Sequence, residues 1–479
     1  MKLHDLINGL STLRVVGSTD IEVSGIQFDS RKVEQGNVFV AQVGTAMDGH
    51  TFVDSCIAKG AAAIVISDSA YIRKGVTTIV VENTDYALGI MAHQWFGCPS
   101  EHLTLVGVTG TNGKTTIATL LYKLVRALGK KAGLLSTVVN YIEDEAIAST
   151  HTTPDALELN GLLRRMVDAG CEYAFMEVSS HAIAQERIAG LVFDGALFTN
   201  LTRDHIDYHK TFDNYRDTKK RLFDGLGKDA FAVTNKDDKN GLVMTQNTRA
   251  NIKTYSTRCL ADFKATILEE DFNGMQLNLN GKEVFVSLVG RFNASNILAI
   301  YGGAVCLGFD SMEVLRVLST LTAVNGRFEA IRSPKKGWTA IVDYAHTPDA
   351  VDNVIQTINE IRKGRLITVV GCGGNRDHGK RPMMAQIAKR GSDQLILTSD
   401  NPRDEEPADI LRDMAAGLTE EELKTTLIIE DRATAIQTAC TLAGEKDVIL
   451  VAGKGHEDYQ IIKGVKYHFD DHEVVRKFI

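Results

Sequence analysis

The sequence predicts an α/β protein of three domains, and three observations support this prediction. The chain has 479 residues, which is more than a single hydrophobic core usually serves. An apolar segment at 103–108 leads into a glycine-rich turn and then into an amphipathic segment. Beyond residue 330, apolar segments alternate with helical ones, the pattern of a parallel sheet covered on both faces. We therefore expect domains at residues 1–98, 99–329 and 330–479.

The composition narrows the class of function. Hydrophobic residues make up 44% of the chain and charged residues 24%, which is typical of a globular protein. The net charge of −8 argues against a general nucleic-acid binder, because phosphate backbones recruit clustered Lys and Arg. No apolar run approaches the length of about 18 residues that a membrane span needs, and the N-terminus has no signal-like run. The seven scattered cysteines are typical of reduced thiols, so we expect a cytoplasmic protein. We also expect a monomer that acts on small molecules and does not bind nucleic acid.

The predicted strands are short apolar segments. In the first region they are 37–42 and 62–67, and in the central region 103–108, 173–178, 195–200 and 231–235. The third region alternates strands at 338–344, 366–370, 394–399, 426–430 and 448–452 with helices that include 350–362 and 383–390. Because ligands of open α/β sheets bind at the carboxyl ends of the strands, we expect a site along one edge of this sheet.

The segment 107–116 predicts a loop that binds the phosphates of ATP. Its pattern is Gly-x-x-Gly-x-x-Gly-Lys-Thr, a variant of the usual loop, which has a glycine where this chain has Val108. Glycines let the backbone approach a phosphate chain, and the following helix directs its positive end towards that chain. Lys114 can reach the β- and γ-phosphates, and Thr115 can ligate Mg²⁺. The predicted ATP-binding residues of the loop are Gly110, Thr111, Asn112, Gly113, Lys114, Thr115 and Thr116.

The alternative for this segment is a glycine turn that only caps a helix. The segment after the loop has helical apolar spacing at Ile117, Leu120, Leu121, Leu124, Val125 and Leu128, and Gly129 is its expected end. Because strand, loop, Lys-Thr pair and helix follow one another in register, phosphate binding is the favoured interpretation.

Two polar segments that follow central strands predict a metal site. Glu177 ends one strand, and His205 lies in a histidine-rich segment after another. Mg²⁺ prefers oxygen ligands, so Glu177 fits directly and His205 is a less usual partner. Each residue alone is more often a paired surface group or a satisfied core residue, and zinc is conceivable for the histidines. A nucleotide site favours Mg²⁺, because this ion bridges the β- and γ-phosphate oxygens.

Taken together, these motifs resemble the Mur ligase family, and the resemblance extends over nearly the whole chain. Several separate motifs occur in the order that is typical of the family. Within the family, the sequence is most similar to the ligases that add the third amino acid of the peptidoglycan precursor. The resemblance implies a UDP-binding first domain, a central ATPase-like domain with a parallel sheet, and a Rossmann-like third domain. The residues shared with the family are Lys114, Glu177, His205, Asn293, Asn296, Arg327 and Asp343.

The resemblance also implies further ligand contacts. Additional contacts to ATP are expected from Asn293, Asn296, Arg327 and Asp343. Contacts to UDP are expected from Ser30, Thr45 and Ala46. Contacts to the muramoyl-dipeptide are expected from Thr152, Thr153, Ser179, Gln185 and Arg187.

In the family, a lysine in a Tyr-x-x-x-Lys segment is carbamylated, and the match here is Lys219 after Tyr215. Carbamylation turns the cation into a carboxylate-like anion that helps to bind a second Mg²⁺. The alternative is a solvated lysine, since Lys220 and Arg221 follow it. The expected metal ligands are therefore Thr115, Glu177, His205 and Lys219, and the expected catalytic residues are Lys114, Glu177, His205 and Lys219.

The tetrapeptide at 400–403 is expected to select the amino acid. In the family, this motif with arginine accompanies meso-diaminopimelate, whereas relatives that add L-lysine commonly lack the arginine. Diaminopimelate has a distal carboxylate that lysine lacks, and Arg403 can pair with it through two hydrogen bonds. The alternative for Arg403 is a salt bridge to an acidic neighbour among residues 404–406. The expected amino-acid contacts are Arg376, Asp400, Asn401, Arg403, Gly453 and Glu457.

The reaction that the resemblance implies belongs to peptidoglycan biosynthesis and has two steps. ATP phosphorylates the D-glutamyl γ-carboxylate of UDP-N-acetylmuramoyl-L-alanyl-D-glutamate, and the amine of meso-diaminopimelate then displaces the phosphate. ATP and Mg²⁺ are the expected cofactors. Three alternatives remain open: the same ligase using L-lysine, a ligase similar to folylpolyglutamate synthetase, and a nucleotide-dependent binding protein without catalysis.

Overall fold

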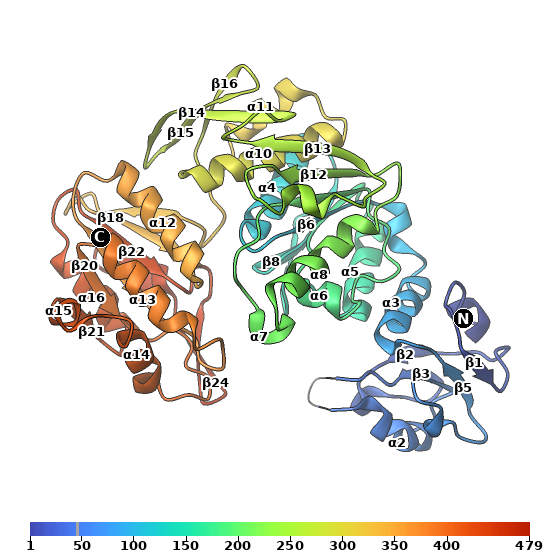
Figure 1. Ribbon diagram of the computed structural model, residues 1–479. Coiled ribbons are helices and arrows are strands. Elements are labelled where there is room, and N and C mark those ends of the chain that lie inside the picture. Colours follow the sequence, from blue (N-terminus) through green and yellow to red (C-terminus); the bar gives the residue numbers. More distant parts are fainter. Residues whose placement is uncertain (45–46) are drawn as a thin grey trace.

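The computed structural model describes residues 1–44 and 47–479, and its strands form three sheets and a separate hairpin. Figure 1 shows the central sheet with its helices between an N-terminal part and a C-terminal part. The predicted α/β class with three successive parts is confirmed. Thr45 and Ala46, two of the predicted UDP contacts, lie outside the described residues.

The N-terminal part is built on a five-stranded sheet with the order β1-β5-β4-β3-β2, in which β1 is antiparallel to β5. All residues of β3, β4 and β5 are buried, so these strands are covered on both faces. The strands are β1 (Arg14–Val16), β2 (Gly25–Gln27), β3 (Asn37–Val40), β4 (Ala63–Ile66) and β5 (Thr77–Val80). The helices are α1 (Leu3–Leu6), η1 (Ser30–Lys32), η2 (Gly49–Phe52), α2 (Val53–Ala58), η3 (Ser69–Tyr71) and α3 (Thr84–Trp95).

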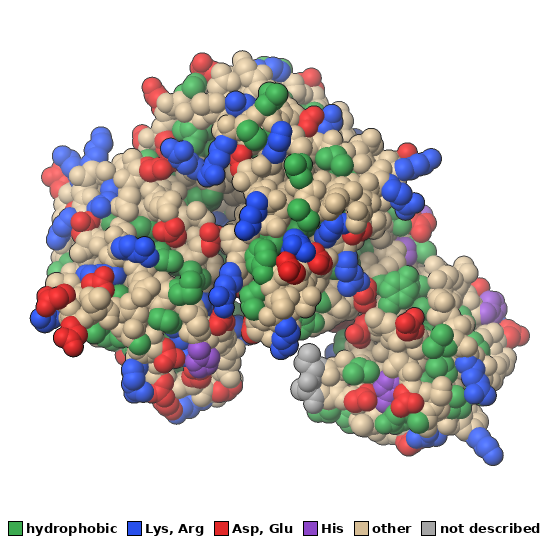
Figure 2. Space-filling view, viewed as in Figure 1, with side chains coloured by type: hydrophobic (Ala, Val, Ile, Leu, Met, Phe, Trp, Pro, Cys, Tyr) green, Lys and Arg blue, Asp and Glu red, His purple; other side chains and the backbone are tan. Residues whose placement is uncertain are grey.

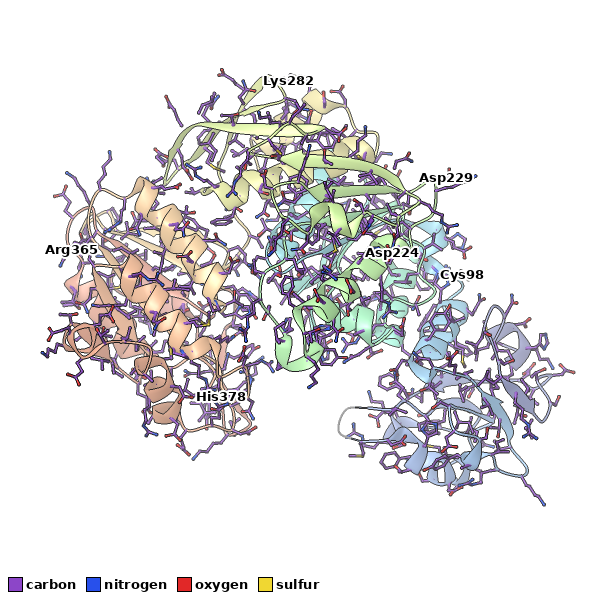
Figure 3. All side chains as sticks on the ribbon, in the orientation of Figure 1. Cys98, Asp224, Asp229, Lys282, Arg365 and His378 are labelled. Atoms are coloured by element: carbon purple, nitrogen blue, oxygen red, sulfur yellow. The ribbon has the colours of Figure 1, made fainter. Side chains whose placement is uncertain are left out.

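Helix α3 leads from the N-terminal part to the central part. It begins after Asn83, whose side chain accepts hydrogen bonds from the backbone N–H groups of Asp85 and Tyr86 and so caps the helix. Cys98 follows the helix and lies at the junction of the two parts (Figure 3). The short helix η4 (Pro99–His102) then leads into the first strand of the central sheet.

The central part contains an eleven-stranded sheet with the order β16-β15-β14-β13-β12-β11-β6-β10-β7-β8-β9. The strands from β14 to β7 in this order are parallel, and antiparallel strands extend the sheet at both edges. The strands are β6 (Thr104–Thr109), β7 (Ala132–Leu135), β8 (Val139–Ile142), β9 (Glu145–Ala148), β10 (Tyr173–Glu177), β11 (Gly195–Phe198), β12 (Phe231–Asn235), β13 (Asn251–Ser256), β14 (Phe263–Asp271), β15 (Gly274–Leu279) and β16 (Lys282–Val286).

Helices cover both faces of this sheet. Successive residues of β6 show the arrangement, because Val106 packs with α4 and α10 whereas Leu105 packs with α5 on the other face. The helices are α4 (Lys114–Ala127), α5 (Ala156–Asp168), α6 (Ser180–Ala184), α7 (Ile206–His209), α8 (Phe212–Asp224), α9 (Gly241–Met244), α10 (Arg291–Cys306) and α11 (Ser311–Leu318).

The C-terminal part has a six-stranded sheet with the order β17-β18-β22-β19-β20-β21, in which β17 is the antiparallel edge strand. Leu450 of β22 packs with α12 and α13, while Ile449 packs with α16 on the other face, so the sheet is doubly wound. The strands are β17 (Glu329–Arg332), β18 (Thr339–Asp343), β19 (Leu366–Val370), β20 (Gln394–Leu397), β21 (Thr426–Ile428) and β22 (Val448–Ala452), with the hairpin β23 (Tyr459–Ile462) and β24 (Val465–His468). The helices are α12 (Pro348–Ile361), α13 (Lys380–Gly391), α14 (Pro407–Ala415), α15 (Glu420–Lys424), α16 (Arg432–Leu442) and α17 (Asp471–Arg476).

The predicted strands all have counterparts in these sheets, and the predicted helices correspond to α4, α12 and α13. The antiparallel extensions of the central sheet were not predicted. Within the part of the chain that the structure describes, no helix is long and apolar enough to cross a membrane.

A half-buried ion pair ties α17 to β17 and predicts a pH dependence of stability. His472 lies 3.0 Å from Glu329 and 3.1 Å from Asp470. Burial opposes its charge, but the hydrogen bond and charge of Glu329 outweigh burial and raise the pKa of His472 above its ordinary 6.5. The protonated pair therefore stabilises the fold fully below pH 6.5, and this contribution is lost as the pH rises through the folded-state pKa.

We expect a His472→Gln variant to lack this pH-dependent contribution, which is up to about 1 kcal/mol. The Tm of the unaltered chain should fall by up to about 2 °C more than that of the variant between pH 6 and pH 8.5. Parallel thermal scans of both proteins measure this difference, and equal falls in Tm would contradict the assignment.

Candidate active site

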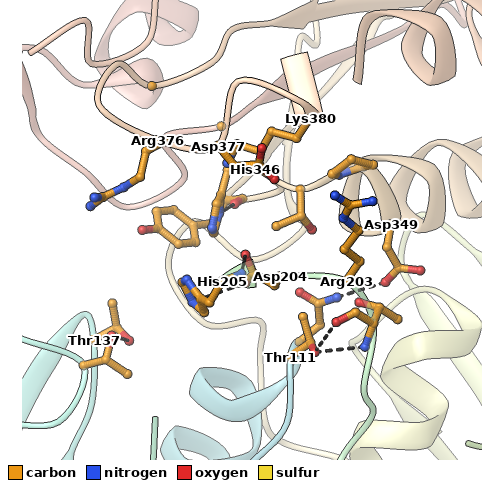
Figure 4. A pocket seen from close by; sticks show the side chains of 18 of the residues that line it. Thr111, Thr137, Arg203, Asp204, His205, His346, Asp349, Arg376, Asp377 and Lys380 are labelled. Carbon is orange, nitrogen blue, oxygen red and sulfur yellow. Dashed lines mark hydrogen bonds and ion pairs between the residues drawn. The ribbon is translucent and has the colours of Figure 1, made fainter. Parts of the chain in front are cut away.

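A cavity of about 610 Å³ lies between the central and C-terminal parts and receives the carboxyl ends of strands from both sheets. Figure 2 shows the surface hollowed between these parts, with Lys and Arg side chains along the hollow. Inside it, Thr111, Asp204 and His205 come from the central part, while His346, Arg376 and Lys380 come from the C-terminal part (Figure 4). A second cavity of about 530 Å³ adjoins the first and shares Asn112, Gly113 and Arg327 with it.

The predicted phosphate loop joins β6 to α4 at the wall of both cavities. Gly113 has a φ of +88°, and a Cβ atom there would lie 2.6 Å from the side-chain oxygen of Asn296, so only glycine fits. The Nζ of Lys114 donates hydrogen bonds of 2.9 Å to the carbonyl oxygens of Gly110 and Thr111. Burial lowers the pKa of Lys114, and the nearby carboxylate of Glu177 opposes that shift. The loop therefore concentrates an ammonium group and a helix N-terminus where an anion can bind.

The smaller cavity suits the base and sugar of a nucleotide, because polar side chains line it beside apolar ones. Asn296 donates to the side-chain oxygen of Asn293 at 3.0 Å, and both residues lie at the start of α10. Asp343 ends β18 and accepts hydrogen bonds from the N–H groups of Phe328 and Ala345. Burial raises the pKa of Asp343. The structure thus brings the predicted ATP contacts Asn293, Asn296 and Asp343 to one cavity, next to Thr116 of the loop.

Oxygen ligands for a hard cation converge beside the phosphate loop. The hydroxyl of Thr115 donates to Oε2 of Glu177 at 3.0 Å, and the N–H of Thr137 donates to Oε1 at 2.7 Å. Arg327 donates to the Thr115 hydroxyl at 3.0 Å. Glu177 is only 1% exposed, and a buried carboxylate beside a hydroxyl is the chemistry that Mg²⁺ prefers, so the residues fit this ion.

His205 reaches the cavity from the loop before α7, and its Nε2 lies 3.3 Å from Asp204. Although 44% of its side chain faces the open cavity, the surrounding protein lowers the pKa of His205 to about 4, against the opposing charge of Asp204. Its ring is therefore neutral at neutral pH, which is the state that ligates metals.

Lys219 lies on α8, behind the phosphate loop. Its side chain is 1% exposed, its Nζ donates to the carbonyl of Gly110 at 2.9 Å, and it sits 4.8 Å from the ring of Tyr215. Burial, with the nearby charge of Lys114, lowers the pKa of Lys219 well below its usual value. This environment excludes the alternative of a solvated surface lysine.

The residues expected to contact the muramoyl-dipeptide form one hydrogen-bonded group at the end of β10. The Thr153 hydroxyl donates to the carbonyl of Glu177 at 2.8 Å and accepts from the N–H of Ser179 at 3.1 Å. Arg187 donates to the carbonyl of Thr153 at 2.7 Å and pairs with the side chain of Gln185. Thr152 lines the larger cavity, whereas Ser30 lies in the N-terminal part and lines neither of these cavities.

All of the expected amino-acid contacts line the end of the larger cavity that the C-terminal part forms: Arg376, Asp400, Asn401, Arg403, Gly453 and Glu457. Asn401 donates to Oε2 of Glu457 at 2.8 Å, which joins the loops after β20 and β22. Arg376 is exposed at the rim of the cavity.

Arg403 makes no ion pair with any residue in the described ranges. Its Nη1 donates to the carbonyl of Gly374 at 2.9 Å. Two of its three acidic neighbours are engaged elsewhere, since Glu405 pairs with Arg381 at 2.8 Å and Glu406 with Lys463 at 2.9 Å, and the third, Asp404, forms no ion pair with it. The alternative of a local salt bridge for Arg403 is therefore wrong, and its guanidinium retains donors for a ligand.

Two loops of this site, one with Gly326 and the other with Gly455, are in direct backbone contact at these glycines. Gly326 precedes Arg327, and Gly455 lies between the amino-acid contacts Gly453 and Glu457. A Cβ at Gly326 would lie 2.1 Å from the backbone N of His456, and one at Gly455 would lie 2.6 Å from the carbonyl oxygen of Gly326. Both glycines have positive φ, +66° and +52°. No larger residue fits at either position without separating the two loops.

Sequence reasoning missed several cavity residues. Lys380 donates to the carbonyl of His346 at 2.9 Å, and Arg203 and Asp204 also line the larger cavity. Lys454 is fully buried beside Glu457. The one sequence signal for Lys454 is its position between two glycines in a loop that follows a buried strand.

Comparison with known proteins covers the chain almost throughout. Three descriptions match successive parts: "Mur ligase family, catalytic domain" at 22–96, "Mur ligase middle domain" at 108–304 and "Mur ligase, glutamate ligase domain" at 326–455. A relative from Parabacteroides distasonis is 61% identical over 480 residues, covering 100% of this chain and 99% of its own, and is named UDP-N-acetylmuramoyl-L-alanyl-D-glutamate--2,6-diaminopimelate ligase.

Solved structures agree with this match. One structure of a ligase with that name is 32% identical, has a TM-score of 0.71, and covers 100% of this chain and 98% of that chain. A folylpolyglutamate synthase of Mycobacterium tuberculosis has a TM-score of 0.62 at 16% identity, covering 78% of this chain and 93% of that chain. At this identity, the second likeness shows a shared fold alone.

The fold and the site are those of an α/β enzyme with a phosphate-loop motif at a cavity between two of its parts. The three matched descriptions and the relative at 61% identity then identify the family. The chain belongs to the Mur ligase family.

Proposed function

We propose that this protein joins meso-diaminopimelate to UDP-N-acetylmuramoyl-L-alanyl-D-glutamate in an ATP-dependent reaction of peptidoglycan biosynthesis. The observation that carries the proposal is the position of Lys114 and Arg403 on one cavity. One end of that cavity suits a phosphoryl group, and the other end offers an unpaired guanidinium to a distal carboxylate. The name of the relative from Parabacteroides distasonis supports the same substrates.

In the first step, the nucleotide lies across both cavities, with its base near Asn293 and Asp343 and its phosphates at the loop. Lys114 and the N–H groups of the loop stabilise charge on the phosphoryl group as it moves to the D-glutamyl γ-carboxylate. Thr115, Glu177, His205 and carbamylated Lys219 would hold Mg²⁺, which supplies positive charge to the phosphate oxygens when bound.

In the second step, the amine of diaminopimelate forms a C–N bond to the acyl carbon and loses a proton to solvent, while the C–O bond to phosphate breaks and phosphate leaves with the electron pair. Arg376 and Arg403 hold the carboxylates of the amino acid, and Glu457 faces its distal ammonium. Because both substrates meet in one cavity, the amine is oriented towards the acyl phosphate before it reacts.

The precursor extends from this cavity to the N-terminal part. Its peptide contacts Thr152, Thr153, Ser179, Gln185 and Arg187, and its UDP contacts Ser30 and residues 45–46. We propose domain boundaries near residues 98 and 329, supported by the positions of the three sheets. We also propose that the chain acts as a cytoplasmic monomer, since one chain carries every part of the site.

The direct test is phosphate release with ATP, Mg²⁺ and UDP-N-acetylmuramoyl-L-alanyl-D-glutamate, with meso-diaminopimelate and L-lysine offered separately. We expect release with diaminopimelate only. Release with lysine would keep the ligase but discard the assigned role of Arg403. Release with neither amino acid would reopen the question of the substrate class, including folates.

Replacing Arg403 with alanine should raise the KM for diaminopimelate by roughly 30-fold or more, because a bidentate partner of a carboxylate is lost. The KM for ATP should stay unchanged, since Arg403 is distant from the phosphate loop. Arg412→Ala is the matched control, because Arg412 is exposed on α14 and its one ion pair within the described part of the chain is with Asp409. Steady-state kinetics with each substrate varied measure the effect, and equal weakening of both substrates would refute the assignment.

A further inference from the structure

Lys454 is a lysine without any exposed surface. It lies in the loop after β22, and its Nζ is 3.1 Å from Oε2 of Glu457 and 3.8 Å from Oδ1 of Asp400. The ring of Tyr459 covers it at 5.4 Å. A buried ammonium is costly unless carboxylates pair with it, so the two acidic side chains account for its presence. The mechanism above assigns it no role.

The two oxygens of Glu457 have different surroundings. Oε2 accepts hydrogen bonds from Asn401 at 2.8 Å and from Lys454 at 3.1 Å. Among the described residues, no donor lies within hydrogen-bond distance of Oε1, and Glu457 lines the larger cavity. One oxygen is therefore fixed by the protein, and the other is available to a ligand.

The group formed by Asp400, Lys454 and Glu457 carries an excess of one negative charge. Asp400 and Glu457 contribute two carboxylates, and Lys454 contributes one cation. Behind them, Arg432 and Asp471 are both fully buried and neutralise each other through two contacts of 2.8 Å. The hydroxyl-bearing rings of Tyr344 and Tyr459 also face this group and are uncharged at neutral pH. A ligand ammonium would neutralise this group of three, while the neighbouring Arg403 and Arg376 are suited to the carboxylates of the same ligand.

We infer that Lys454 is a positioning residue that acts as a built-in counter-ion, holding Glu457 ionised and directing its free oxygen to a distal ammonium of the amino acid. The inference rests on the proposed function and adds a residue to it. Burial raises the pKa of Glu457, the charge of Asp400 raises it further, and Lys454 opposes both. Without Lys454, the carboxyl would take up a proton more readily and would recognise an ammonium less well.

The competing interpretation is that Lys454 only fills space in the loop. The two interpretations differ in which substrates they affect. A packing defect would weaken every amino acid to a similar extent. The loss of a counter-ion would weaken only those that carry a distal ammonium.

The experiment compares meso-diaminopimelate with 2-aminopimelate, which keeps the distal carboxylate and lacks the distal amine. In a Lys454→Met variant, the KM for diaminopimelate should rise by roughly 30-fold or more, while that for 2-aminopimelate changes little. Lys454→Arg should recover part of the preference, because it restores the charge. Lys466→Met is the matched control, since Lys466 is exposed and also lies over the Tyr459 ring, at 3.7 Å. Equal rises for both amino acids, or no rise for either, would overturn the inference.

The pH dependence of kcat/KM is a second measurement that distinguishes the two interpretations. If Lys454 only filled space, its replacement would not shift this pH dependence. The acidic limb of kcat/KM for diaminopimelate should shift to higher pH in Lys454→Met and stay in place in Lys466→Met. The unaltered protein is the control that separates a failure of the proposed function from a failure of the role of Lys454. If it does not turn over diaminopimelate, the proposed function fails; if it does and the Lys454 variant keeps both its substrate preference and its pH profile, only the role of Lys454 fails.

Discussion

Replacing Lys114 with methionine is expected to reduce phosphate release by about a thousandfold or more. Among the described residues, the ammonium of Lys114 bonds only to carbonyl groups of its own loop, so the variant loses charge at the phosphates and few contacts that hold the fold. Methionine keeps an unbranched apolar stem close to that of lysine and removes the ammonium. The measurement is single-turnover phosphate release at saturating ATP.

Lys123→Met is the matched control for this change, because Lys123 lies on the same helix, α4, outside both cavities. We expect the control to retain activity and both variants to have the thermal stability of the unaltered chain. Activity within tenfold of the unaltered protein in Lys114→Met would show that the loop does not act on the transferred phosphoryl group.

The Lys219→Ala variant is expected to lose activity by about a hundredfold or more and to regain part of it when short carboxylic acids are added. Carbamylation joins an uncharged amine to CO₂ and releases a proton, and the burial of Lys219 favours the uncharged amine. Truncation leaves a space behind the phosphate loop where a small carboxylate can replace the carbamate. Phosphate release measured against acetate or propionate concentration tests this expectation.

The neighbouring Lys220 separates this role from a general effect on α8. Its ammonium pairs with Asp224 on the same helix instead of reaching the phosphate loop. Lys220→Ala should therefore keep most of its activity and show no response to carboxylic acids. Full activity of Lys219→Ala without any added acid would remove the carbamate from the mechanism.

The parallel cores of the sheets could be predicted because their strands are continuous apolar runs. β6, β10 and β19 are buried nearly throughout, so each strand stands out from its polar surroundings in the sequence. Strand β14, where the antiparallel extension begins, buries only some of its residues and carries charged side chains between them. Such a pattern is weak in sequence, and the antiparallel extension of the central sheet was missed for this reason.

In the candidate site, too, residues could be predicted where their neighbours in the sequence define their role, and were missed where that role depends on residues far away in the sequence. Lys114 and Thr115 are recognisable because a loop motif fixes their surroundings within a few residues. The proposed role of Lys454 depends on Asp400, which is far from it in the sequence. The two residues come close only because β20 and β22 lie in one sheet. Likewise, the free donors of Arg403 depend on Arg381 and Lys463, which pair with two of its acidic neighbours, Glu405 and Glu406.

The contact between Gly326 and Gly455 has a consequence for how specificities can be exchanged among related ligases. The loop that selects the amino acid meets the segment bearing Arg327 with no side chain between them, so the two surfaces fit as a matched pair. A hybrid enzyme assembled by grafting a foreign C-terminal part onto this chain must place its crossover before residue 326. A later crossover would place the native segment around Gly326 against a foreign loop around residue 455, and the two backbones would not fit closely. The hybrid would then have a new amino-acid pocket, but Arg327 would no longer be held beside the phosphate loop.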